Sequence, residues 1–156
     1  MVVTLNVNIE ISAVKGALDK IKRKMPSATA RGIAKASMFI QNAIKNRTSK
    51  GVDFKGRSFR PYSPSYAKKR AKEGRTQTPN LFSSGQMLGN MTFKKLTQTK
   101  GQIFFPNRRQ NLKAFYNDSF GVGKSNIKRE FFSVNAKEEA KAVKIFTQTL
   151  EKELRL

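Results

Sequence analysis

Residues 12–47 read SAVKGALDKIKRKMPSATARGIAKASMFIQNAIKNR, and this stretch decides the fold. Side chains on one helical face recur every three or four residues, at Val14, Leu18, Ile21, Met25, Ala30, Ile33, Ser37, Ile40 and Ile44. That spacing predicts an amphipathic α-helix. Pro26 interrupts the pattern and Ser27 could cap a new helix, so the stretch is predicted as one kinked helix or two. Gly32 weakens the helix, because glycine costs about 1 kcal/mol relative to alanine there.

The segments on either side of this stretch differ from it in pattern. Before it, apolar side chains occupy every second position, at Val3, Leu5, Val7, Ile9 and Ile11. This alternation predicts a strand that packs on one side. After it, residues 48–80 show no long apolar period, are punctuated by Pro and Gly, and carry mostly basic charge. We expect a mobile basic arm there, with a short helix near 65–72.

The second half of the chain predicts several short elements and one further long helix. A helical turn ending near Gly89 could be capped by Ser83 or Ser84. Strands are expected at 91–97 and 102–105, with a turn at Gly101, and a further short strand at 114–121. Ser133 or Asn135 could cap a terminal helix, whose apolar face would hold Ala136, Ala140, Val143, Phe146, Leu150 and Leu154.

These elements predict one α+β domain over residues 1–156. It would contain a small, mostly antiparallel sheet, a long N-terminal helical segment, a C-terminal helix and an extended basic loop. No internal repeat of 20–50 residues is visible.

Composition restricts the chemistry that this chain can perform. It has 32 Lys and Arg against 10 Asp and Glu, a formal net charge of +22, and neither Cys nor His. The sequence therefore offers no disulfide, no thiolate nucleophile, no cysteine-bound zinc and no histidine base. No apolar run approaches the ~20 residues of a membrane span, and the N-terminus lacks the pattern of a signal peptide. We expect an intracellular, non-membrane protein that is not an enzyme and uses no cofactor or metal.

Two motif-like features do not amount to catalytic sites. Residues 120–125 (FGVGKS) end like a phosphate-binding loop, but Asp118 occupies the place of the first glycine that this loop requires. Glu138 and Glu139 are adjacent, as helix neighbours that do not share a face. A flexible turn and helix surface charge explain these residues.

The basic arm is the candidate contact region. Clustered Lys and Arg suit phosphate binding, and rings at Phe54, Phe59, Tyr62 and Tyr66 could stack on bases or cover a small apolar patch. Candidate partner or oligomer contacts are Phe59, Arg60, Tyr62, Lys68, Lys69 and Arg70. Candidate DNA-facing residues are Arg57, Lys72, Arg75, Arg108 and Arg109. A non-specific nucleic-acid-binding protein is therefore an alternative function.

Several segments together resemble one known family. Residues 56–62 (GRSFRPY) precede the basic run 68–70 (KKR), and residues 81–90 read LFSSGQMLGN. Later come 116–121 (YNDSFG) and 129–132 (REFF), ahead of the terminal helix. This order resembles the virion-morphogenesis, tail-completion proteins of Mu-like and other tailed phages, and the related head–tail joining proteins. Phe59 stands where that family usually has Trp.

The resemblance implies a structural role in the virion, with assembly in the host cytoplasm. It implies a homo-oligomeric ring, with a hexamer favoured, through which DNA passes. Expected partners are connector or tail-tube proteins, with non-specific DNA contact as a further candidate. The basic charge would then face either DNA or the acidic surface of a partner.

Overall fold

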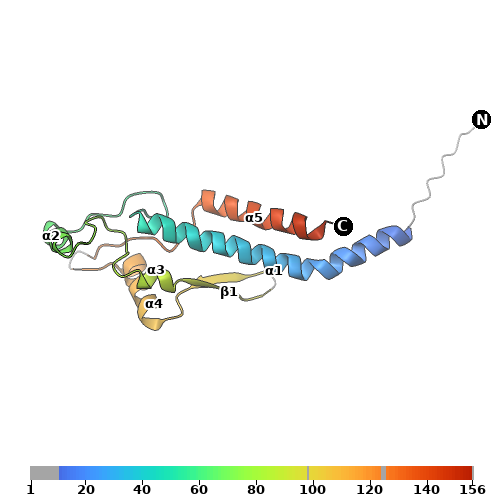
Figure 1. Ribbon diagram of the computed structural model, residues 1–156, viewed down its shortest axis with the longest axis horizontal. Coiled ribbons are helices and arrows are strands. Elements are labelled where there is room, and N and C mark those ends of the chain that lie inside the picture. Colours follow the sequence, from blue (N-terminus) through green and yellow to red (C-terminus); the bar gives the residue numbers. More distant parts are fainter. Residues whose placement is uncertain (1–10, 98, 124–125, 156) are drawn as a thin grey trace, which may run out of the picture.

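A computed structural model describes residues 11–97, 99–123 and 126–155, without the side chains of 11–14. The molecule is elongated, and helix α1 (Ile11–Ser49) runs through most of its length (Figure 1). At 39 residues, α1 is about 58 Å long. The strand predicted at 3–11 lies outside the described residues, except for Ile11, where α1 begins.

The predicted helical stretch is one helix and not two. Pro26 lies inside α1. The Ser27 hydroxyl donates a hydrogen bond to the carbonyl of Lys24, at 2.9 Å, and so does not cap a new helix. A hydroxyl that bonds back to the preceding turn in this way is compatible with a continuous helix.

Helix α5 (Ala136–Leu154) packs antiparallel along α1 (Figure 1). Arg47 pairs with Glu138 near one end of the contact, and Arg31 pairs with Glu153 near the other, each at 2.5 Å. The cap is Asn135, whose side chain accepts from the backbone N–H of Glu138, as one of the two predicted alternatives had it.

The predicted apolar face of the C-terminal helix is wrong in its first half. Ala136 and Ala140 are exposed and Val143 is 58% exposed. The side of α5 that faces inward includes Ile145 and Thr149, which are partly or fully buried. Packing against α1 determines which face of α5 is buried, and the helical period of the sequence alone does not predict that face.

A hairpin covers another side of α1 (Figure 1). Strand β1 (Thr92–Lys95) pairs antiparallel with β2 (Gly101–Phe104), and Phe93 lies opposite Ile103. Both strands were expected from the sequence. The molecule is therefore an α+β fold with a long N-terminal helix, a C-terminal helix and a small antiparallel sheet.

Short helices complete one end of the molecule. They are α2 (Pro64–Lys72), α3 (Gln86–Asn90), α4 (Arg108–Phe115) and the π-helical turn η1 (Tyr116–Phe120). The helix expected near 65–72 is confirmed as α2. The cap of α3 is Gly85 at φ 73°, and neither predicted serine makes a capping bond. The strand predicted at 114–121 is wrong, because α4 begins at the cap Asn107 and continues directly into η1.

The buried core lies at this same end. Phe131, Met91 and Leu88 are at most 3% exposed, and Ile44 of α1 packs with them. The core thus joins the end of α1 to α3, the hairpin and the segment before α5. Within the described ranges, every helix is too short or too polar to cross a membrane.

Candidate functional site

A cavity of about 780 Å³ lies between α3, α4 and the basic segment, which is the stretch 48–80 predicted as a basic arm. Tyr62, Tyr66 and Arg70 line it from the basic segment, and Leu81 and Phe82 line it from the loop before α3. The remaining lining residues come from the basic segment, from that loop, from α3 to η1 and from the segment before α5: Ser63, Ser83, Ser84, Gly85, Met87, Gln110, Lys113, Asn117, Val122, Gly123, Ile127 and Arg129. We call this cavity the Arg129 pocket. Its volume falls in the range of pockets that bind ligands.

Arg129 is the unusual residue of this pocket. It is 4% exposed, and its Nε atom has no hydrogen-bond acceptor among the described residues. No carboxylate in the described ranges pairs with its guanidinium. Burial lowers the pKa of Arg129 below its ordinary value, while Tyr62 and Tyr66 act in the opposite direction. Because an arginine starts with a very high pKa, the group stays charged at neutral pH.

Two guanidinium groups pack against one tyrosine ring. Arg129 lies 5.2 Å from the centroid of the Tyr62 ring, and Arg70 lies 5.1 Å from it. Tyr66 meets the same ring edge-on at 5.0 Å. Arg70 is also buried, but its Nε donates to the carbonyl of Thr76 at 2.7 Å. Arg70 therefore holds the turn after α2, whereas Arg129 makes no such bond.

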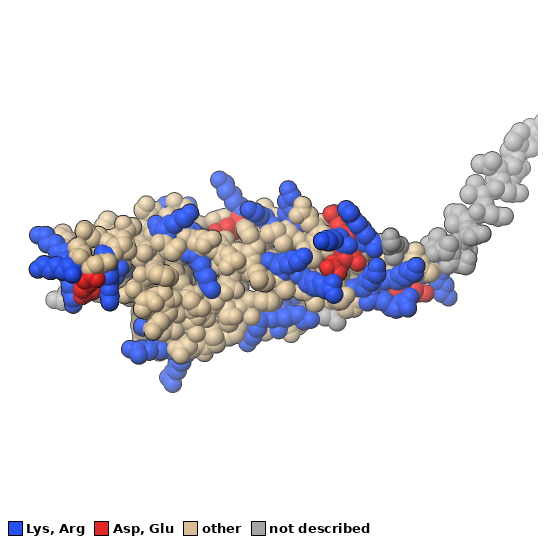
Figure 2. Space-filling model, in the orientation of Figure 1, with Lys and Arg blue, Asp and Glu red and all other residues tan. Residues whose placement is uncertain are grey.

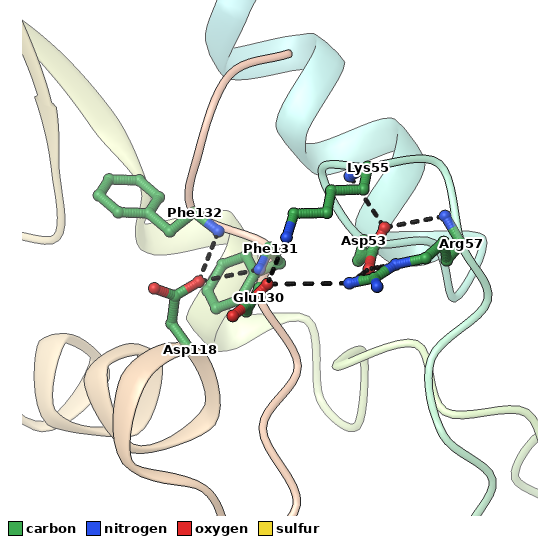
Figure 3. A network of polar contacts seen from close by, with 7 residues as sticks. All are labelled: Asp53, Lys55, Arg57, Asp118, Glu130, Phe131 and Phe132. Atoms are coloured by element: carbon green, nitrogen blue, oxygen red, sulfur yellow. Dashed lines mark hydrogen bonds and ion pairs between the residues drawn. The ribbon is translucent and has the colours of Figure 1, made fainter.

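The backbone around Arg129 is fixed by η1. The Arg129 N–H donates to the carbonyl of Asn117 at 2.7 Å. Asp118 Oδ1 accepts the N–H groups of Phe131 and Phe132, each at 2.8 Å (Figure 3). The buried Phe131 ring then anchors the segment in the core. Arg129 is thus positioned by bonds on both sides of it.

A second network of polar contacts connects the start of the basic segment to Glu130, which follows Arg129 in the chain (Figure 3). Asp53 Oδ1 accepts the backbone N–H groups of Lys55 and Arg57, at 2.9 and 2.8 Å. Arg57 Nε donates to Asp53 Oδ2 at 2.9 Å, and both Lys55 and Arg57 lie 3.9 Å from Glu130. Burial raises the pKa of Asp53, but the hydrogen bonds and charge of Arg57, with the Lys55 backbone bond, outweigh burial. Its pKa therefore lies below the ordinary value.

The candidate contact residues separate into buried and exposed groups. Phe59 is 6% exposed and belongs to the core, so its ring does not reach the surface of this molecule. Tyr62 and Arg70 line the pocket. Arg60, Lys68 and Lys69 are exposed, and their contacts stay predictions. The segment 48–80 is packed at Phe59 and Arg70, and its mobility also stays a prediction.

The candidate DNA-facing residues lie on several different elements, and the contacts of the described residues do not join them into one cluster. Arg57 bonds to Asp53, and Arg75 lies 3.4 Å from Glu73. Arg108 and Arg109 are in the first turn of α4, and Lys72 is in the last turn of α2. All of these side chains are exposed. Figure 2 shows Lys and Arg in several groups, at both ends and along the edges of the visible face, with a broad area of other residues between them.

An exposed apolar patch was missed by the sequence reading. It consists of Leu112, Phe115, Tyr116 and Phe120 on α4 and η1, which are 46–65% exposed. The three rings lie together, with centroids 5.6–6.0 Å apart. We call it the η1 patch. The helical spacing of these residues from position 112 was the available signal, but a strand prediction at 114–121 splits them between two faces.

Among the described residues, His, Cys, Asp and Glu form no group of three or more that could hold a metal ion. Comparison with known proteins finds no matching family model, no matching curated protein and no matching solved structure.

Proposed function

We propose that this protein is a structural subunit of a phage or prophage particle, acting in tail completion or head–tail joining. The observation that carries the proposal is the η1 patch. Four large apolar side chains, each about half exposed, sit together on a protein of charge +22. Contiguous exposed apolar surface marks a site of protein contact. The η1 patch is therefore the surface through which copies of this chain associate into a ring, with a hexamer favoured.

The basic surface supports the same proposal. Lys and Arg lie in several separate groups on the visible face and do not concentrate in one place (Figure 2). Such a distribution suits attraction to a phosphate backbone without sequence reading, as expected around a passage for DNA. It equally suits docking on acidic surfaces of connector or tail-tube proteins. The subunit would be non-enzymatic, made in the host cytoplasm and retained in the virion.

Mass measurement in solution tests the proposal. Because +22 per copy opposes association at low salt, light scattering is recorded across a range of ionic strengths. We expect a ring-sized species that Phe120→Ser converts to monomer. Val143→Ser is the matched control: Val143 is 58% exposed on α5, outside the η1 patch, and its loss leaves the assembly intact. A wild-type chain that stays monomeric at every salt concentration contradicts the proposal.

A binding titration distinguishes the structural role from the alternative function, nucleic-acid binding. A short DNA duplex of random sequence is titrated with the protein across the same salt range. The structural proposal expects weak binding that disappears as salt rises. A monomer that binds a defined nucleic acid at nanomolar concentration in physiological salt supports the nucleic-acid-binding alternative.

A further inference from the structure

The Arg129 pocket holds a buried positive charge without a negative partner in the described residues. A charge removed from water is stable only when it is paired or hydrogen-bonded. Arg129 has the ring of Tyr62 on one side, and its Nε atom is without an acceptor. The neighbouring cations Arg70 and Lys113 also line the pocket and add positive potential to it. An anionic group entering the pocket would meet donors that are already in place.

Much of the remaining pocket wall is apolar. Leu81, Phe82 and Met87 contribute side chains from the loop before α3 and from α3 itself, and Ile127 contributes one from the segment before Arg129. Leu81 has a positive φ of 51°, a conformation that costs energy for a residue with a bulky side chain. A volume of about 780 Å³ exceeds the space that one carboxylate needs. An occupant must therefore fill an apolar space as well as present a negative charge.

We propose that the Arg129 pocket receives a segment of a partner protein that places an Asp or Glu carboxylate beside an apolar side chain. The carboxylate accepts hydrogen bonds from the Arg129 guanidinium, and the apolar side chain packs between Tyr66 and Phe82. The charge of +22 attracts nucleic acids as well as acidic protein surfaces. The apolar part of the wall favours a protein segment, because such a segment can place an apolar side chain beside its carboxylate. This inference rests on the proposed structural role and adds the chemistry that the partner must carry.

The three tyrosines allow a direct test. Tyr62 and Tyr66 line the pocket, and Tyr116 lies in the η1 patch outside it. The full chain labelled with 3-fluorotyrosine therefore shows three fluorine resonances, two from the pocket and one internal control. The probe is the capped peptide acetyl-Gly-Phe-Glu-Leu-Gly-amide, and its control replaces Glu by Gln. We expect the Glu peptide to shift the two pocket resonances saturably and to bind at least about tenfold more tightly than the Gln peptide.

Variants assign this preference to one residue. Arg129→Met keeps the length of the side chain and removes its charge, so it should abolish the preference for Glu over Gln. Arg23→Met, on an exposed side chain of α1 outside the pocket lining, should leave the preference unchanged. If Arg129→Met does not fold, the comparison of the two peptides on the wild-type chain still decides the matter. Equal affinity for both peptides, or a shift at Tyr116 alone, overturns the inference.

A further arm distinguishes a small acid from a protein segment. 3-Phenylpropanoate carries the same two groups without a peptide backbone. Binding of this acid with exclusion of the Glu peptide overturns the assignment to a partner protein. A chain that prefers the Glu peptide but never assembles contradicts the proposed ring alone. A chain that forms rings without a preference for Glu contradicts the pocket inference alone.

Discussion

Replacing Gly32 by alanine tests the packing of α5 on α1, because two opposing effects can be compared there. Alanine favours an α-helix over glycine by about 1 kcal/mol. At Gly32, however, a new Cβ would lie 2.7 Å from Cδ2 and 2.9 Å from Cε2 of Phe146. Crowding of this kind in a packed contact costs about 1–3 kcal/mol. The net effect expected for Gly32→Ala is a loss of unfolding free energy of about 0–2 kcal/mol.

Gly16 provides the matched control in the same helix. Apart from its chain neighbours and the adjacent backbone of α1, no atom of the described residues comes within 4 Å of a Cβ built at Gly16. Gly16→Ala should therefore keep the helical gain, raising stability by up to about 1 kcal/mol. Urea unfolding followed by circular dichroism measures both variants, and the two should differ by about 1–3 kcal/mol.

A double variant shows whether Phe146 is the cause. Gly32→Ala combined with Phe146→Leu should lose less than the sum of the two single changes, because the smaller side chain makes room for the new methyl group. Equal stabilisation by alanine at both glycines would refute the reasoning. It would mean that α5 does not pack on α1 at this position.

Three further changes test the contacts that hold the segment before α5 and the basic segment. Arg47→Met removes the 2.5 Å pair with Glu138 and leaves a mostly buried carboxylate, so unfolding free energy should fall by about 3 kcal/mol in a urea titration. Asp118→Ala removes the acceptor of two backbone N–H groups and should cost about 2 kcal/mol by the same assay, with faster amide exchange at those groups. The pKa of Asp53 is lower in the folded chain than in the unfolded chain, so its contribution is full above about pH 4 and is lost as pH falls through the folded pKa. Thermal melts recorded across that range should therefore show Asp53→Asn with lower stability at neutral pH and a smaller acid-induced loss than the parent. An unchanged acid-induced loss would contradict the role given to Asp53.

The elements that depend on local pattern could be predicted from the sequence. The period of residues 12–47 predicts helix there, as one helix or two, and the strand-like runs on either side of Gly101 predict the hairpin. The candidate caps Ser133 and Asn135 predict where α5 begins, and Asn135 is the cap. The sequence-based predictions fail where contacts between distant parts of the chain determine the local structure. Residues 114–121 read as a strand, yet the chain continues there from α4 into η1. Gly32 reads as a weakness of the helix, but it is where Phe146 of α5 lies against α1.

The candidate site was predicted in part. Tyr62 and Arg70 were named from the sequence because they lie in a conspicuously basic segment, and both line the pocket. In the sequence, Arg129 stands out only as part of the motif at 129–132, because nothing next to it in the chain indicates burial. Its environment comes from Tyr62 and Asn117, which no helical or strand period connects to position 129. A pattern in sequence reports neighbours along the chain, and this site is made by neighbours in space.

The pairing of α1 with α5 has a consequence for biosynthesis. Arg47 and Glu138 are 91 residues apart, and Arg31 and Glu153 are 122 apart. At about 5–20 residues per second, a ribosome needs roughly 5–25 s to make the intervening chain. During that interval, the face of α1 that α5 covers in the folded protein is not yet covered by it. In α1, Asp19 is the one acidic residue among many basic ones, so nascent copies repel one another. The basic composition thereby protects the longest helix from premature association until α5 is synthesised.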